Sequence, residues 1–202
     1  MNILLANMVI IALILFAAFF LIFIFSVTIF GHIFGAPFVR SDKKRIATML
    51  ECAAIKSGEI VYDLGSGDGS LVIEAARRGA HAIGIEINPF LTWYSRWRIR
   101  KNNFSGKVRI IAKDFRNIDL HDANIIFLYL WPETIVKLKE KLTRELTPGT
   151  RIISNAFAIS GWIPILVRDG IYVYEIKSET RNPKSETNSN VQNPKFKNVF
   201  RT

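Results

Sequence analysis

The sequence predicts an α/β fold with a doubly wound, mostly parallel sheet, preceded by one transmembrane helix. From about residue 41 onward, short apolar segments typical of buried strands alternate with amphipathic segments of helical period. A glycine-rich turn at residues 65–69 follows the first of these strands. Residues 3–30 are almost entirely apolar, and no charged side chain occurs before Arg40. We therefore expect an N-terminal anchor (1–34), a folded domain (35–177) and a polar tail (178–202).

The N-terminal segment is long enough to span a bilayer, which needs about 20 apolar residues. A cleaved signal peptide is the alternative, but the apolar run is longer than such a peptide requires, no basic residue precedes it and no clear Ala-x-Ala site follows. The first charges beyond the run include Arg40, Lys43, Lys44 and Arg45. By the positive-inside rule, we expect a single-pass membrane protein with its domain on the cytoplasmic side, or on the matrix side in a mitochondrion.

Composition limits the chemistry of the domain. The net charge of +10 allows nucleic acid, an anionic membrane surface or an acidic substrate as a partner. Cys52 is the only cysteine, which excludes an intrachain disulfide and a thiolate metal cage. The three histidines share no ligand spacing, so we expect no metal site.

The elements of the domain follow in order. Ser41 is the expected N-cap of a helix that runs to about Lys56, and its apolar face is formed by Ile46, Met49, Leu50 and Ala53. Five strands are expected at Ile60–Leu64, Ala82–Ile85, Val108–Ala112, Ala123–Tyr129 and Thr150–Ser154. Helices are expected at Ser70–Arg78, at Pro89–Lys101 and from about residue 132 to Leu142. Ile171–Ile176, after a turn at Asp169-Gly170, should be one arm of a closing antiparallel pair. The tail is polar and is expected to be disordered.

The glycine turn has the pattern Asp63-x-Gly65-x-Gly67-x-Gly69. A dinucleotide fingerprint would require glycine at position 70, where this chain has Ser70, so a hydride-transfer enzyme is not indicated. An acid ahead of the glycines would repel a pyrophosphate, but it suits a ligand with a cationic amino-acid group. A strand–turn–helix corner without any ligand is the alternative.

Two further acids follow the next two expected strands. Glu86 comes 23 residues after Asp63. This is close to the interval of roughly 20 residues at which an acid reaches a ribose diol in this kind of fold. An ordinary surface acid is the alternative for this position. Asp114 follows the third strand, where a carboxylate can accept from an adenine amino group while the ring of Phe115 covers the base. Together the three acids predict one nucleoside-binding site at the carboxyl ends of the strands.

The helix after Glu86 begins with Asn88 as its cap and Pro89 at its first position. It carries an aromatic stripe and a basic C-terminal half; the residues are Phe90, Trp93, Tyr94, Trp97, Arg96, Arg98, Arg100 and Lys101. One interpretation makes the stripe part of the core, with a solvated basic face. The other makes it a docking surface for membrane or substrate.

The glycine turn resembles the first motif of class I S-adenosylmethionine methyltransferases. The chain as a whole resembles the membrane-anchored lysine methyltransferases that modify the ATP synthase c subunit and the adenine nucleotide translocase, together with their prokaryotic relatives. Three stretches carry this resemblance: Ala36-Pro-Phe-Val39, Val61-Tyr-Asp-Leu-Gly-Ser-Gly-Asp-Gly69 and Glu86-Ile-Asn-Pro-Phe-Leu-Thr-Trp-Tyr-Ser-Arg96. It extends from about Gly35 to Phe157 and implies a seven-strand Rossmann-like methyltransferase sheet that binds S-adenosyl-L-methionine.

This resemblance implies a protein-lysine N-methyltransferase acting on a membrane protein close to the lipid surface. The expected cofactor-binding residues are Asp63, Gly65, Gly67, Gly69, Glu86, Asn88, Asp114 and Phe115. An aromatic wall for the substrate amine is expected from Tyr129, Trp131 and Pro132, with Trp93 or Trp97 nearby, while Glu133 either accepts a hydrogen bond or begins the next helix.

The alternatives are a nucleic-acid or small-molecule methyltransferase and a tethered module that binds the cofactor without turnover. The residues after the fourth strand, Leu130-Trp131-Pro132-Glu133, lack the Asp/Asn-Pro-Pro-aromatic pattern of enzymes that methylate base amino groups.

Overall fold

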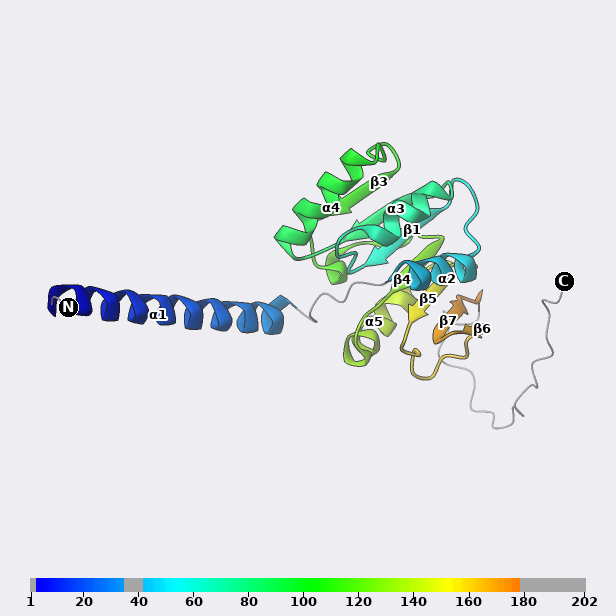
Figure 1. The fold of residues 1–202 in the computed structure, drawn as a ribbon. Helices are drawn as coiled ribbons and strands as arrows, with labels where there is room; N and C mark the ends of the chain where they lie inside the picture. Colours follow the sequence, from blue (N-terminus) through cyan, green and yellow to red (C-terminus); the bar gives the residue numbers. More distant parts are fainter. Residues whose placement is uncertain (1–2, 35–41, 179–202) are drawn as a thin grey trace.

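The computed structural model describes residues 3–34 and 42–178 and places the side chains of residues 7–24 and 42–178. Its N-terminal part is one helix, α1 (Ile3–Phe34) (Figure 1). The window Asn7–Ile24 has a mean hydropathy of 3.0 and none of it is buried, so α1 is long and apolar enough to cross a membrane. A signal sequence would meet the same criterion. The Ala36–Val39 stretch, Ser41 and the tail from residue 179 onward lie outside the described residues.

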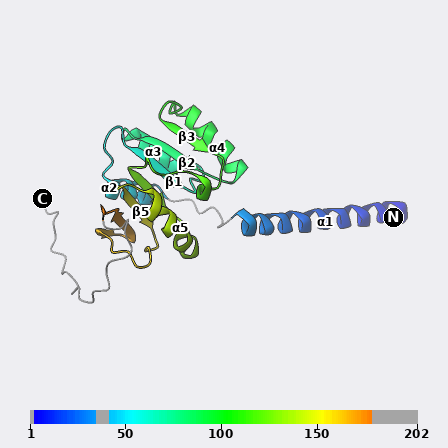
Figure 2. The same cartoon turned by 180° about the vertical axis from the view of Figure 1, so that it is seen from behind.

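The domain is built on a seven-stranded sheet in the order β3-β2-β1-β4-β5-β7-β6 (Figures 1 and 2). The strands are β1 (Ile60–Leu64), β2 (His81–Ile85), β3 (Val108–Ile111), β4 (Ile125–Leu128), β5 (Arg151–Asn155), β6 (Leu166–Arg168) and β7 (Ile171–Glu175). β1 to β5 pair in parallel, and β7 runs antiparallel to both β5 and β6. The prediction of a doubly wound, mostly parallel sheet closed by an antiparallel pair is confirmed.

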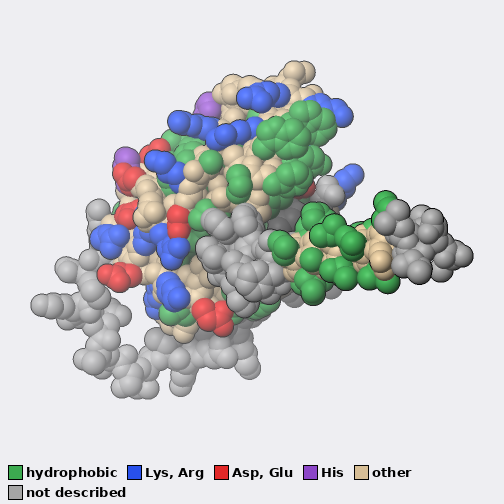
Figure 3. Space-filling model, turned by 90° about the vertical axis from the view of Figure 1, so that its left-hand side faces the viewer, with side chains coloured by type: hydrophobic (Ala, Val, Ile, Leu, Met, Phe, Trp, Pro, Cys, Tyr) green, Lys and Arg blue, Asp and Glu red, His purple; other side chains and the backbone are tan. Residues whose placement is uncertain are grey.

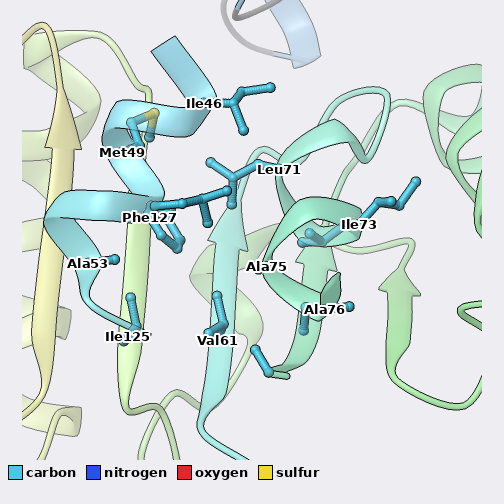
Figure 4. Close-up of a cluster of buried hydrophobic side chains, with 14 of the residues drawn as sticks. Ile46, Met49, Ala53, Val61, Leu71, Ile73, Ala75, Ala76, Ile125 and Phe127 are labelled. Carbon is cyan, nitrogen blue, oxygen red and sulfur yellow. The ribbon is translucent and has the colours of Figure 1, made fainter. Parts of the chain in front are cut away.

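Helices cover both faces of the sheet. They are α2 (Lys43–Ala53), α3 (Ser70–Arg77), α4 (Pro89–Lys101) and α5 (Pro132–Glu145), with a 3-10 turn η1 (Phe115–Asn117) after β3. Residues of α2, α3 and α4 share one hydrophobic cluster with the sheet, whereas those of α5 belong to a second cluster on the other face. Figure 4 shows the first cluster, in which Phe127 of β4 lies between Met49 of α2 and Leu71 of α3. The four residues expected on the apolar face of α2 are all buried.

Element boundaries differ from expectation mainly at α2. The expected N-cap was Ser41, but Asp42 caps the helix, because its carboxylate oxygen Oδ1 accepts a hydrogen bond from Arg45 N at 2.6 Å. The helix also ends at Ala53 rather than near Lys56, since Ala54 adopts a left-handed conformation with φ of 47°. At its other end α5 continues to Glu145, beyond the expected Leu142, and the following Leu146 is buried in the second cluster.

All five parallel strands end on one side of the sheet, which we call the carboxyl edge, and begin on the other, which we call the amino edge. The glycine turn follows β1 at the carboxyl edge, and the segments 86–88, 112–115, 129–131 and 156–157 follow β2 to β5 there. The predicted site residues are therefore gathered along one edge of the sheet, as the parallel order requires.

Candidate functional site

The glycine turn depends on its glycines for conformation and for packing. Gly65, Gly67 and Gly69 have φ values of 86°, 54° and 74°, which other residues adopt only with strain. A Cβ atom on Gly69 would lie 3.0 Å from Cβ of Ser95 on α4. The amides of Gly65 and Ser66 donate to Ile85 O at 2.9 and 3.0 Å, which ties the turn to the end of β2.

Glu86 joins this turn to the start of α4. Its Oε2 accepts a hydrogen bond from Gly67 N at 2.8 Å, and its Oε1 accepts one from Asn88 N, also at 2.8 Å. The residue is buried, so the alternative of an ordinary surface acid is wrong. Because a carboxylate offers about four lone-pair sites, Glu86 retains acceptor capacity for a ligand hydroxyl.

Asp63 is a buried acid surrounded by other acids. The pKa of Asp63 is raised to about 7, mainly because the side chain is buried and secondly because the negative charges of Glu86 and Asp68 lie nearby. Three carboxyl groups thus lie close enough at the glycine turn to repel one another. A cationic ligand group placed there would favour the ionised form of Asp63.

Arg98 of α4 binds the glycine turn. Its Nη1 lies 2.8 Å from Asp68 Oδ2 and donates to Asp68 O at 2.7 Å and to Ser70 Oγ at 2.8 Å. This role was not predicted from the sequence, where Arg98 was one of the bases of the solvated face of α4. The signal was an acid between two glycines, but no spacing rule connects Asp68 with a base thirty positions downstream.

The inner face of α4 carries no aromatic ring. Thr92, Ser95 and Ile99 are buried, and Thr92 Oγ1 donates to Glu86 O at 3.2 Å. Phe90, Trp93 and Trp97, in contrast, are exposed by 67%, 62% and 44%. The interpretation of the aromatic stripe as part of the core is therefore wrong. Close contact with Gly69 leaves no room for aromatic rings on the inner face, so the rings lie outside.

Asp114 and Phe115 lie at the end of β3, as expected. Asp114 caps η1, with Oδ1 accepting from Arg116 N at 2.9 Å, and both of its oxygens also accept from the Arg116 guanidinium. These hydrogen bonds lower the pKa of Asp114. Phe115 packs, partly buried, against the second hydrophobic cluster.

An aromatic corner follows β4. Tyr129 and Trp131 are exposed by 39% and 49%, and Pro132 begins α5. Phe157, just after β5, packs against Trp131, with 6.0 Å between the centroids of the two rings. Trp93 and Trp97, which were expected nearby, pair with Phe90 and Tyr94 of α4. Phe157 was not predicted as a site residue, although its position shortly after a parallel strand was a usable signal.

The chain is similar in sequence to known methyltransferases. The profile of the ANTKMT methyltransferase domain matches residues 63–166. A protein-lysine N-methyltransferase of Saccharolobus islandicus is 37% identical over 150 residues, which cover 69% of this chain and 93% of that protein. The human lysine N-methyltransferase named for the ATP synthase c subunit is 34% identical over 128 residues, or 63% of this chain. The match spans only about half, 54%, of the human protein.

Solved structures show the same architecture. An RNA methyltransferase of Salinibacter ruber, crystallised in complex with S-adenosyl-L-homocysteine, is 35% identical to this chain. It superposes with a TM-score of 0.67 over 70% of this chain and 95% of its own. The sheet described above is therefore shared with a protein that holds the product form of the cofactor.

Proposed function

Because the chain belongs to the ANTKMT methyltransferase domain family, and is thus an S-adenosylmethionine-dependent methyltransferase, we propose that it methylates a lysine side chain of a membrane protein. The observation that carries this proposal is the aromatic corner of Tyr129, Trp131 and Phe157 at the same edge of the sheet as the buried acids. Relatives named for lysine methylation support the choice of acceptor.

The acids and the glycine turn fit the cofactor chemically. Asp63 is buried with a raised pKa, and a positively charged amino-acid group is the kind of ligand that would stabilise its carboxylate. Glu86 can accept from ribose hydroxyls while it retains its two backbone hydrogen bonds. We assign cofactor binding to these residues with Gly65, Gly67, Gly69, Asn88, Asp114 and Phe115. When bound, S-adenosyl-L-methionine supplies a methyl group already activated by its sulfonium.

The aromatic corner suits an amine acceptor. A lysine amine must lose its proton before it can act as a nucleophile, and an apolar environment favours the neutral form. Tyr129 and Trp131, with Pro132 and Phe157, supply aromatic and apolar surface next to Leu130, whose Cδ2 would lie 3.4 Å from a Cβ atom built on Gly65. Glu133 lies in the first turn of α5, where its charge suits the helix dipole.

Membrane anchoring through α1 would limit the acceptors that the domain reaches. In this proposal residues 1–34 form the anchor and residues 35–177 the catalytic domain, with the basic flank on the cytoplasmic or matrix side. A tethered enzyme gains effective concentration only for targets that share its surface. A lysine near the headgroups of the same bilayer is therefore the favoured acceptor.

The experiment offers the full chain, reconstituted in lipid nanodiscs, three acceptors in parallel with methyl-labelled cofactor: membrane proteins, total RNA and extracted lipid. Label should appear on lysine of membrane proteins, identified by mass spectrometry, and a Glu86→Ala variant should lose it together with affinity for S-adenosyl-L-homocysteine. RNA is the competing acceptor, because the Salinibacter ruber relative is named for it. Label in RNA or lipid with none on lysine would refute the lysine proposal, whereas no label in any fraction, despite cofactor binding, would indicate a binding module.

A further inference from the structure

The outer face of α4 is an exposed stripe of aromatic and basic side chains. Phe90, Trp93 and Trp97 are spaced at i, i+3 and i+7, so they lie on one side of the helix. Arg100 and Lys101 extend the same side toward the C-terminus, and Lys101 Nζ lies 5.0 Å from the centre of the Trp97 ring. We call these five residues the α4 outer face. Figure 3 shows apolar side chains gathered beside Lys and Arg on this side of the molecule.

The fold does not account for this face. The contacts that fix α4 come from its inner side, through Thr92, Ser95, Arg98 and Ile99. Three large rings left in solvent on a single 13-residue helix are unusual for a protein surface, and exposed apolar patches of this kind commonly mark an interaction site. We therefore interpret the α4 outer face as an interaction surface.

Charge indicates an anionic occupant. Residues 87–113 contain no Asp or Glu and carry seven basic residues: Arg96, Arg98, Arg100, Lys101, Lys107, Arg109 and Lys113. Two of these are used internally, since Arg98 binds Asp68 and Arg96 Nη2 donates to Ile110 O at 2.9 Å. Trp and Phe beside Lys and Arg form the combination that enters the headgroup region of bilayers.

The connection to α1 brings the membrane close to this part of the domain. The first turn of α2 lies at the carboxyl edge, because Arg45 Nε donates to Asn155 Oδ1 at 2.6 Å and Asn155 is the last residue of β5. Only residues 35–41 separate Phe34 from Asp42, and so short a chain reaches less than about 30 Å even when fully extended. Phe90 lies in the first turn of α4, which begins at the same edge just after β2.

We propose that the α4 outer face docks on the bilayer that holds α1, with Phe90, Trp93 and Trp97 in the headgroup region and Arg100 and Lys101 against anionic lipid. This inference rests on the anchoring given under Proposed function. Because Arg98 and Ser95 fix α4 to the glycine turn, docking of α4 also fixes the height of the cofactor site above the membrane. The enzyme then selects acceptor lysines by their depth relative to the membrane surface.

The test measures the depth of α4 in the full chain. Cys52→Ser removes the native thiol, and a nitroxide is attached through Trp93→Cys or, as a matched control, through Val167→Cys. Both sites are exposed apolar positions, by 62% and 53%, but Val167 lies on β6 at the opposite end of the sheet from β3 and α4. In nanodiscs containing phosphatidylglycerol, collisions with oxygen relative to a water-soluble nickel chelate should be several-fold more frequent at position 93 than at 167.

The charged half of the face has its own control. Lys101→Glu should reduce the oxygen accessibility of the label at 93, whereas Lys137→Glu on α5, the same charge change at another exposed helical lysine, should not. Nanodiscs of phosphatidylcholine alone should weaken docking as Lys101→Glu does. If the Trp93→Cys protein does not bind S-adenosyl-L-homocysteine, Phe90→Cys takes its place.

A label at 93 that remains as water-exposed as the label at 167 overturns the proposal. In that case two further measurements identify the occupant of the face. Immobilisation of the label only when an acceptor protein is added indicates a protein-docking face. Loss of RNA affinity in Lys101→Glu indicates RNA. Lysine methylation is scored on the same samples. Methylation without lipid contact refutes the docking alone, and lipid contact without lysine methylation refutes the proposed acceptor alone.

Discussion

The two edges of the sheet differ in how their charged side chains are paired. At the amino edge, Arg151 pairs with Glu59 and donates to the carbonyl oxygens of Ala53 and Ala54 at the end of α2. Asn124 Oδ1 accepts from Ile60 N at 2.7 Å and so ties the starts of β1 and β4 together. Donors and acceptors that begin the strands are thus matched within the protein itself.

At the carboxyl edge, carboxylate groups lie close to one another. Asp63 lies near Asp68 and Glu86, and of these three Asp68 is paired with a base, Arg98. Buried like charges destabilise the folded domain, so the arrangement makes sense where a cationic ligand completes it. The contrast suggests that the amino edge stabilises the fold and the carboxyl edge is shaped for binding. Changes at the two edges should then have different consequences.

The largest expected effect is on stability, at the amino edge. Arg151→Met leaves Glu59 and two carbonyl groups without their donor, and since both side chains of the ion pair are less than 20% exposed, we expect a loss of roughly 2–4 kcal/mol in the free energy of unfolding. Urea titration of the full chain in detergent, followed by tryptophan fluorescence, measures it. The double variant Arg151→Met with Glu59→Met should recover part of the loss. Affinity for S-adenosyl-L-homocysteine should not change; if it fell sharply, the two edges would not be independent.

The second effect is a pH dependence at the carboxyl edge. The pKa of Asp63 is raised from 3.8 to about 7 in the folded state, so the folded state binds this proton more tightly than the unfolded state does. Its contribution to stability is complete below about pH 4 and is lost as the pH rises through about 7. Between about pH 5 and about pH 8, the ligand-free protein should lose roughly 2–3 kcal/mol that the Asp63→Asn variant does not lose. Parallel pH profiles for the two proteins would contradict the assignment.

Arg98 should affect binding more than stability, as a positioning residue for the glycine turn. Arg98→Met removes three hydrogen-bonding contacts to Asp68 and Ser70, and we expect affinity for S-adenosyl-L-homocysteine to fall about tenfold, or about 1.4 kcal/mol. Isothermal titration calorimetry measures the change. Arg98→Lys should restore part of it, because an ammonium can still reach Asp68. Arg100→Met, an exposed neighbour on the same helix, is the control and should bind like the unaltered chain.

Much of the carboxyl edge could be predicted from sequence, because local patterns encode it. The strand before Gly65, the acid at Glu86 and the Asn88-Pro89 helix start each have a short-range signal. Packing across the fold could not be predicted in this way. Gly84 in β2 is an example, because it has no Cβ atom and so leaves room for the side chain of Ser66. A Cβ atom at position 84 would lie only 2.6 Å from Ser66 Oγ. The outward orientation of the α4 rings likewise follows from the contact of Ser95 with Gly69, which helical periodicity alone does not contain.

The smallest expected effect separates the edges most sharply, because it compares one substitution at two places. Phe157 packs on Trp131 at the carboxyl edge, whereas Phe104, after the end of α4, packs on the first hydrophobic cluster with the Arg77 guanidinium 5.2 Å from its ring centre. Both are partly buried, so replacement by Ala should lower stability in both. Only Phe157→Ala should raise KM for the lysine acceptor, about fivefold, since one aromatic contact contributes about 1 kcal/mol. Initial rates at saturating cofactor measure KM. An equal rise in Phe104→Ala would mean that KM reports general loosening of the domain, and the aromatic corner would lose its assignment as the acceptor site.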